Sequence, residues 1–153
     1  MYLFDPDLRR FGLKPPNGIE VRDISGPKGL GVFALRDFRP GMLVEVSPVV
    51  LLRVPFDSLP PAIQDRVFNW DDLTGQTGGA HALPLGYGCL YNGDNPANLR
   101  YEAVPEARTF IQFIAARLIS TGEELTVNYS GPKGAAESAD DWWFDRRAIK
   151  RSR

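Results

Sequence analysis

The chain has 153 residues, of which 43% are hydrophobic and 24% are charged, and these proportions exclude a chain that is disordered throughout. Its 19 acidic and 18 basic residues nearly cancel, so the overall charge does not indicate a general nucleic-acid binder. One cysteine, Cys89, and one histidine exclude an internal disulfide and a structural zinc site built from these residue types. The sequence shows neither a signal-peptide pattern nor an apolar run of membrane-spanning length. We therefore expect a soluble protein of the cytoplasm, with export to a host cell or to the nucleus left open.

β-Branched and apolar residues gather in short segments along the chain, which predicts a mostly β domain. Glycine and proline, with 15 and 13 residues, separate these segments with turns. The tetrapeptide Gly-Pro-Lys-Gly occurs at 26–29 and at 131–134, and we interpret both copies as turns because their flanking residues differ. The expected strands are 19–24, 29–35, 42–52, 81–85, 98–104 and 124–129.

Little helix is expected in this chain. Pro60-Pro61 suits a helix start, and the apolar residues of 62–68 share one helical face, which predicts a short helix there. Residues 109–118 fit either a strand or a helix, because periodicity alone does not separate the two. A final helix is expected to begin at Asp140-Asp141, because acidic side chains are favoured at a helix start.

Three segments have compositions suited to binding a polar ligand. Glycines in Gly29-Leu30-Gly31 permit close approach of a ligand to the backbone, because glycine has no side chain. Residues 91–98, Tyr-Asn-Gly-Asp-Asn-Pro-Ala-Asn, are rich in side-chain amides, which when buried bind either loop backbone or a polar ligand. Residues 122–129, Gly-Glu-Glu-Leu-Thr-Val-Asn-Tyr, form a turn and a strand that ends on a tyrosine. Each segment alone also fits an ordinary turn or strand end.

In order and spacing, these segments resemble the SET-domain family of protein-lysine methyltransferases. Residues 27–34 resemble the Gly-x-Gly-(Val/Leu)-Phe-Ala element of the family, and 36–45 resemble the charged stretch that follows it. Residues 91–98 resemble the Asn-His-Ser-x-x-Pro-Asn element, and 122–129 are similar to Gly-Glu-Glu-Leu-Thr-x-(Asp/Asn)-Tyr. Residues 142–147 resemble the aromatic tail of the smallest viral and bacterial members.

The resemblance implies a mainly β, β-clip-like SET fold of short strands in several small sheets. It also implies a knot-like C-terminal arrangement, one short inserted helix and a short C-terminal helix. On this basis, the chain divides into an N-terminal extension at 1–18, a SET domain at 19–131 and an aromatic, basic segment at 132–153.

The resemblance further implies methyl transfer from S-adenosylmethionine to the ε-amine of a protein lysine, with S-adenosylhomocysteine as the product. Tyr129 is the expected catalytic residue, because its hydroxyl would align the amine with the methyl group. Basic proteins such as histones are the expected substrates, with ribosomal or host proteins fitting equally well. Neither a membrane nor a metal is expected, and a homodimer is left open. The expected cofactor-binding residues are Lys28, Gly29, Leu30, Gly31, Asn92, Gly93, Tyr129, Trp142 and Trp143, and the expected substrate-channel residues are Tyr91, Tyr101 and Val127.

Gly93 departs from the family pattern, which has a histidine at this position. In the family, that histidine reaches the cofactor adenine largely through its backbone, which glycine retains. Glycine lacks the packing of a side chain and gives the loop more freedom. Two alternatives therefore stay open: a degenerate SET domain that binds cofactor or peptide without turnover, and an unrelated small β domain with a structural role.

Overall fold

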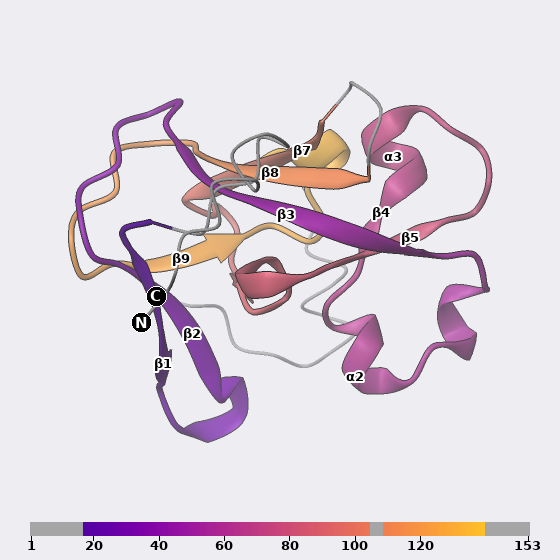
Figure 1. Cartoon of the computed structure of the whole chain (residues 1–153), viewed down its shortest axis with the longest axis horizontal. Helices are drawn as coiled ribbons and strands as arrows, with labels where there is room; N and C mark the ends of the chain where they lie inside the picture. Colours follow the sequence, from indigo (N-terminus) through magenta and orange to yellow (C-terminus); the bar gives the residue numbers. More distant parts are fainter. Residues whose placement is uncertain (1–16, 105–108, 140–153) are drawn as a thin grey trace, which may run out of the picture.

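The computed structural model describes residues 17–104 and 109–139, which form two small sheets with short helical turns between them (Figure 1). The mainly β architecture expected from the sequence is confirmed. Its strands are β1 (Ile19–Asp23), β2 (Leu30–Ala34), β3 (Leu43–Leu52), β4 (Phe68–Asn69), β5 (His81–Pro84), β6 (Asn92–Gly93), β7 (Leu99–Ala103), β8 (Phe110–Ala115) and β9 (Glu124–Val127). Its helices are α2 (Pro61–Gln64) and α3 (Trp70–Thr74), with 3-10 turns η1 (Gly26–Lys28), η2 (Phe56–Ser58), η3 (Gly86–Cys89) and η4 (Pro132–Gly134).

The first sheet, in the order β1-β2-β9-β6, brings together the three segments that the sequence analysis singled out. Strands β1 and β2 form an antiparallel hairpin around η1, and β9 pairs with the other side of β2. Strand β6 lies parallel to β9, with Asn92 opposite Thr126 and Gly93 opposite Val127. Segments separated by about sixty residues in the sequence therefore meet at one sheet.

The second sheet, in the order β4-β5-β3-β8-β7, holds much of the core. The ten-residue strand β3 pairs with β5 through its second half and with β8 through its first half. The ambiguous segment 109–118 contains strand β8, whose Ile111 and Phe113 are fully buried. Pairing with β3 on one side and β7 on the other decides in favour of the strand.

The predicted helix over 62–68 is wrong at its C-terminal end. Helix α2 ends at Gln64, and Phe68 begins β4, where it pairs with Ala82 of β5. Burial of Phe68 between aromatic rings favours this extended backbone over continued helix. A second short helix, α3, follows directly, and the Asn69 side chain caps it by accepting a hydrogen bond from the Asp72 backbone N–H at 3.1 Å. The chain between β3 and β5 thus contains two short α-helices in place of the one expected.

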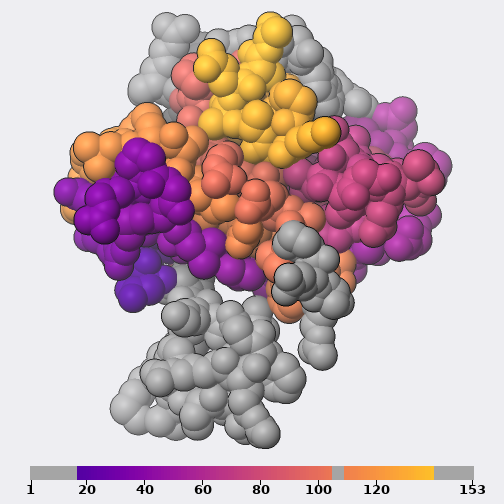
Figure 2. All heavy atoms as spheres, turned by 90° about the horizontal axis from the view of Figure 1, so that it is seen from above, coloured from indigo at the N-terminus to yellow at the C-terminus, as the bar shows by residue number. Residues whose placement is uncertain are grey.

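The chain beyond β9 lies against the segment that follows β6. The Asn128 side chain donates to the Ser138 hydroxyl at 2.9 Å, and the Ala97 backbone N–H donates to the Ala136 carbonyl at 2.8 Å. Figure 2 shows this C-terminal part, in yellow, seated on the surface beside the salmon and orange residues. These contacts join residues 136–138 to the chain around β6 and β9, while the knot-like C-terminal arrangement stays a prediction. The expected helix from Asp140-Asp141 lies outside the described residues.

Both copies of Gly-Pro-Lys-Gly form 3-10 turns, η1 and η4, which confirms the prediction that they are turns. The single cysteine, Cys89, lies at the end of η3. Within residues 17–104 and 109–139, every helix is too short or too polar to span a bilayer.

Candidate functional site

A cavity of about 140 Å³ lies where the β1–β2 hairpin, the end of α2 and the start of β6 approach one another. It is smaller than the roughly 300–1,000 Å³ typical of drug-sized ligands, so it suits one end of a larger molecule. Its walls combine polar, charged and aromatic side chains. They are Pro27, Lys28, Leu30, Asp65, Arg66, Cys89, Leu90, Tyr91, Asn92, Gly93 and Tyr129.

Tyr129 follows β9 by two residues and reaches the cavity wall with its side chain partly buried. Its hydroxyl donates a hydrogen bond of 2.8 Å to the Tyr91 carbonyl, and its ring stacks on Phe68 at 5.1 Å between centroids. Burial raises the pKa of Tyr129 above its ordinary value of 10, and this effect outweighs the opposing one of the Arg66 charge. The phenol is therefore neutral at physiological pH, and it can donate a hydrogen bond.

Asn92 connects the two strands that flank the cavity. Its side-chain Nδ2 donates to the Leu30 carbonyl at 2.9 Å and to Glu124 Oε1 at 2.7 Å. The other Glu124 oxygen lies 3.8 Å from the Lys28 ammonium, which forms an ion pair with it. With both amide hydrogens directed at protein acceptors, the Asn92 side-chain oxygen is the atom that can accept a hydrogen bond from a ligand.

Asn98, the second asparagine of the same segment, has a structural role in the described chain. It is buried, and its side chain donates to the Glu124 carbonyl at 2.7 Å while accepting from the Thr126 N–H at 2.9 Å. These two bonds occupy main-chain groups of β9 that the parallel pairing with β6 leaves available. The side chain thereby fixes the strand that leads to Tyr129.

Glu45 is a functional candidate that the sequence analysis included in a motif but gave no role. It is only 4% exposed, and it accepts hydrogen bonds from the Tyr91 hydroxyl at 2.7 Å and from the Tyr87 N–H at 3.1 Å. Burial raises the pKa of this carboxyl, and the hydrogen bond from Tyr91 opposes that shift. An acidic residue inside the apolar stretch 43–46 is the sequence signal that marks it.

The residues expected to line a substrate channel occupy different places. Tyr91 lines the cavity, whereas Val127 is fully buried in β9. Tyr101 is also buried, and its hydroxyl donates to the Asn128 carbonyl at 3.0 Å. Phe68 connects Tyr101 with Tyr129. Its ring meets that of Tyr101 edge-on, at 4.6 Å between centroids, and stacks on that of Tyr129. Sequence reasoning missed Phe68, since it was placed in a helix.

The expected cofactor residues are only partly gathered around the cavity. Lys28, Leu30, Asn92 and Gly93 line it, but Gly29 and Gly31 do not. A Cβ at Gly31 would lie 3.0 Å from the Phe33 ring and 3.1 Å from Glu124 Oε1, so this glycine permits close strand packing. Trp142 and Trp143 lie outside the described residues. Among the residues that the structure describes, no three His, Cys, Asp or Glu side chains cluster as metal ligands would.

Comparisons with known proteins relate this chain to one family. The model of the SET domain family matches residues 29–130. A Schizosaccharomyces pombe protein named "Histone-lysine N-methyltransferase, H3 lysine-37 specific" is 28% identical over 138 residues, spanning 88% of this chain and 82% of that protein. A crystal structure from Plasmodium falciparum, described as a proposed histone methyltransferase, shares the fold with a TM-score of 0.57 and 22% identity. That match covers 77% of this chain and 96% of the other.

Proposed function

Because the chain belongs to the SET-domain family, we propose that it transfers a methyl group from S-adenosylmethionine to the ε-amine of a lysine in a basic protein. The family match and the methyltransferase relative support lysine methyl transfer as the class of reaction. The observation that carries the proposal is the position of Tyr129, a neutral phenol on the wall of the cavity that Asn92 and Lys28 also line.

The cavity residues fit the amino-acid end of S-adenosylmethionine. This cofactor, when bound, supplies a methyl group on a positively charged sulfur. Lys28 provides positive charge for its carboxylate, while the Asn92 side-chain oxygen suits its ammonium. The Gly93 main chain completes this wall and retains the backbone groups that the resemblance assigns to cofactor contact.

Methyl transfer requires a neutral amine, because an ammonium has no lone pair. A free lysine has a pKa of about 10.4, so near neutral pH only about one in a thousand is neutral, an offset of roughly 4 kcal/mol. The Phe68 ring stacks on that of Tyr129, and an apolar channel beside this phenol would disfavour the ammonium. The Tyr129 hydroxyl would then orient the amine by hydrogen bonding, and no general base on the chain is required.

The substrate is proposed to be a basic, histone-like protein. The Schizosaccharomyces pombe relative is named for a histone H3 lysine, which supports this class of substrate. Charge alone does not separate histones from other basic proteins, so the experiment must include both.

The proposal is tested by incubating the purified chain with methyl-labelled S-adenosylmethionine and three protein sets: core histones, ribosomal proteins and an acidic control protein. Mass spectrometry of the digested products then locates the label. We expect methylated lysine in at least one basic set and none in the acidic control. Absence of label from all three sets would overturn the proposed activity.

A second candidate function is cofactor binding without turnover, and Gly93 is the observation that favours it. Calorimetry with S-adenosylhomocysteine separates the two candidates. Binding without methyl transfer to any set would support the degenerate domain, while failure to bind would remove both candidates.

A further inference from the structure

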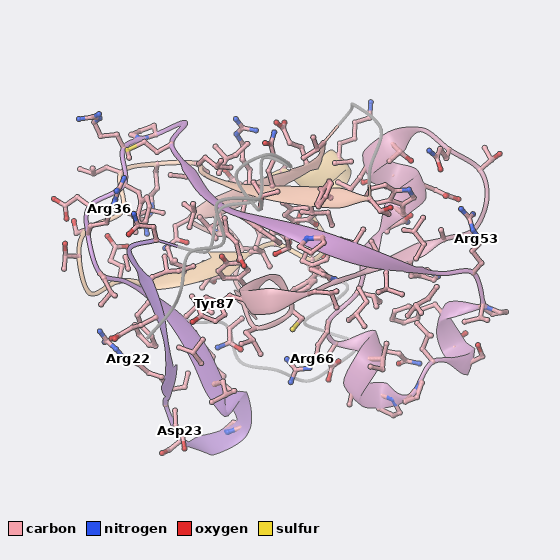
Figure 3. All side chains as sticks on the ribbon, in the orientation of Figure 1. Arg22, Asp23, Arg36, Arg53, Arg66 and Tyr87 are labelled. Atoms are coloured by element: carbon pink, nitrogen blue, oxygen red, sulfur yellow. The ribbon has the colours of Figure 1, made fainter. Side chains whose placement is uncertain are left out.

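Arg66 lies at the cavity wall, although it belongs to the connection between β3 and β4 of the five-stranded sheet. It follows the end of α2, and its Nη1 donates a hydrogen bond of 2.8 Å to the Cys89 carbonyl. In Figure 3, Arg66 extends from the end of α2 toward the side of the molecule that carries the β1–β2 hairpin. This anchor holds the guanidinium at the wall formed by Cys89 and Leu90.

The two cations that line the cavity differ in their partners. The Lys28 ammonium is paired with Glu124 at 3.8 Å, so part of its charge is already compensated. Within residues 17–104 and 109–139, Arg66 has no carboxylate at ion-pair distance, and one bond to a carbonyl leaves most of its donors available. A guanidinium carries five N–H donors in a planar fork that matches a carboxylate with two parallel hydrogen bonds.

We propose that Arg66 binds the carboxylate of the methionine moiety of S-adenosylmethionine, and that it thereby selects amino-acid-bearing nucleosides. This inference rests on the proposed function, and it adds a residue that no motif of the sequence indicated. Tyr129 lines the same cavity, so the carboxylate at Arg66 and the methyl group near Tyr129 belong to one end of the cofactor. The Arg66 charge also acts on the Tyr129 hydroxyl, lowering its pKa against the effect of burial, which agrees with their proximity.

Asp65 complements this assignment. It lines the same cavity directly before Arg66 in the chain, so the end of α2 presents an anionic and a cationic side chain together. An amino-acid end carries both an ammonium and a carboxylate, and such a pair matches it in charge. A nucleoside that lacks the carboxylate would leave the Arg66 fork without its anionic partner.

The alternative is that Arg66 only ties α2 to η3 through the Cys89 carbonyl. Arg66→Gln removes the charge. Loss of the tie to η3 would weaken binding of any ligand of this cavity, whereas loss of a carboxylate partner weakens only a ligand that carries a carboxylate, so two ligands separate the roles. Arg53→Gln is the matched control, since Arg53 lies at the far end of the molecule in Figure 3 and does not line the cavity.

The experiment measures, by calorimetry on the full chain, the affinities for S-adenosylmethionine and for its decarboxylated form. We expect the wild type and Arg53→Gln to prefer the carboxylated ligand about 10- to 100-fold, as a charge-assisted hydrogen-bonded pair provides. Arg66→Gln should lose about 10-fold or more in affinity for S-adenosylmethionine, with the affinity for the decarboxylated form changed less than about 2-fold.

If Arg66→Gln loses affinity for both ligands equally, or keeps the wild-type affinity for both, the inference is overturned while the proposed function stays in place. Failure of the wild type to bind either ligand would overturn the proposed function together with the inference. If Arg66→Gln does not fold, Arg66→Lys takes its place. Lysine keeps the charge without the fork, so a reduced preference for the carboxylated ligand is then expected, and an unchanged preference overturns the inference.

Discussion

The Tyr129 hydroxyl donates a hydrogen bond of 2.8 Å to the main-chain carbonyl of Tyr91. Tyr91 in turn donates through its own hydroxyl to the buried Glu45 carboxylate at 2.7 Å. Tyr129 is therefore connected through one residue to β3, which lies in the middle of the five-stranded sheet. The position of the proposed catalytic hydroxyl depends on packing that lies well beyond the cavity.

The pH dependence of methyl transfer should show no contribution from Tyr129 ionisation below about pH 10, because burial raises the pKa of this phenol above its ordinary value. The rate is expected to increase from about pH 7 to about pH 10 as the substrate lysine loses its proton. Initial rates at saturating cofactor, with protein stability checked at each pH, provide the measurement. A descending limb in this range that disappears in Tyr129→Phe would contradict the assignment.

Glu45 should make stability depend on pH, because burial raises the pKa of its carboxyl above the ordinary value of 4.5. The folded state then holds this proton more tightly than the unfolded state, so the contribution is present at low pH and is lost as pH rises through the folded pKa. Glu45→Gln does not titrate. The free energy of unfolding of the wild type, relative to Glu45→Gln, should fall as the pH rises from below about 4.5 through the raised pKa of Glu45.

Urea unfolding of both proteins at several pH values measures this difference. Circular dichroism at each pH checks that the variant retains the native fold. A difference that stays constant across the range would show that Glu45 has an ordinary pKa.

Gly29 and Gly134 hold the same place in the two Gly-Pro-Lys-Gly turns, with φ values of 67° and 78°. A Cβ at Gly29 would meet nothing within 4 Å, whereas one at Gly134 would lie 1.8 Å from the Tyr101 carbonyl oxygen. Alanine costs about 1 kcal/mol at either position for its positive φ. Gly134→Ala should lose about 2 kcal/mol more, because backbone of β7 must shift. Equal midpoints in urea unfolding would refute this difference.

Asn98→Ala should be more destabilising than Asn69→Ala. The first removes a buried side chain that bonds both the Glu124 carbonyl and the Thr126 N–H, at a cost of about 3 kcal/mol for unsatisfied main-chain groups. The second removes an exposed helix cap, at about 1 kcal/mol. Thermal and urea unfolding measure the loss of stability in the two variants. Similar losses would show that the Asn98 hydrogen bonds contribute little to the free energy of unfolding.

The local sequence predicted the strands that turns separate from their neighbours, such as β1, β2 and β3. It was insufficient for 109–118, because only pairing with β3 and β7, both distant in sequence, decides that this segment is a strand. The same limit explains Phe68, whose aromatic partners come from other parts of the chain and favour a strand over the predicted helix.

The sequence likewise predicted only part of the candidate site. Motif order predicted that residues 28–31, 91–98 and Tyr129 belong together, and the structure places them around one sheet. Arg66 and Glu45 were given no role, because Arg66 reaches the cavity from an insertion without a motif and Glu45 acts through Tyr91. Both depend on contacts between residues that are far apart in the sequence.

The most direct test of the account compares Tyr129→Phe with Tyr87→Phe, measuring single-turnover methyl transfer and the affinity for S-adenosylhomocysteine. Each variant removes one hydroxyl, but the Tyr87 side chain lies outside the cavity lining. We predict that Tyr129→Phe loses on the order of 100-fold in rate with affinity changed less than about 3-fold, as removal of one positioned catalytic hydrogen-bonding group does elsewhere, while Tyr87→Phe matches the wild type. A Tyr129→Phe rate equal to that of the wild type would contradict the claim that this hydroxyl aligns the reacting groups.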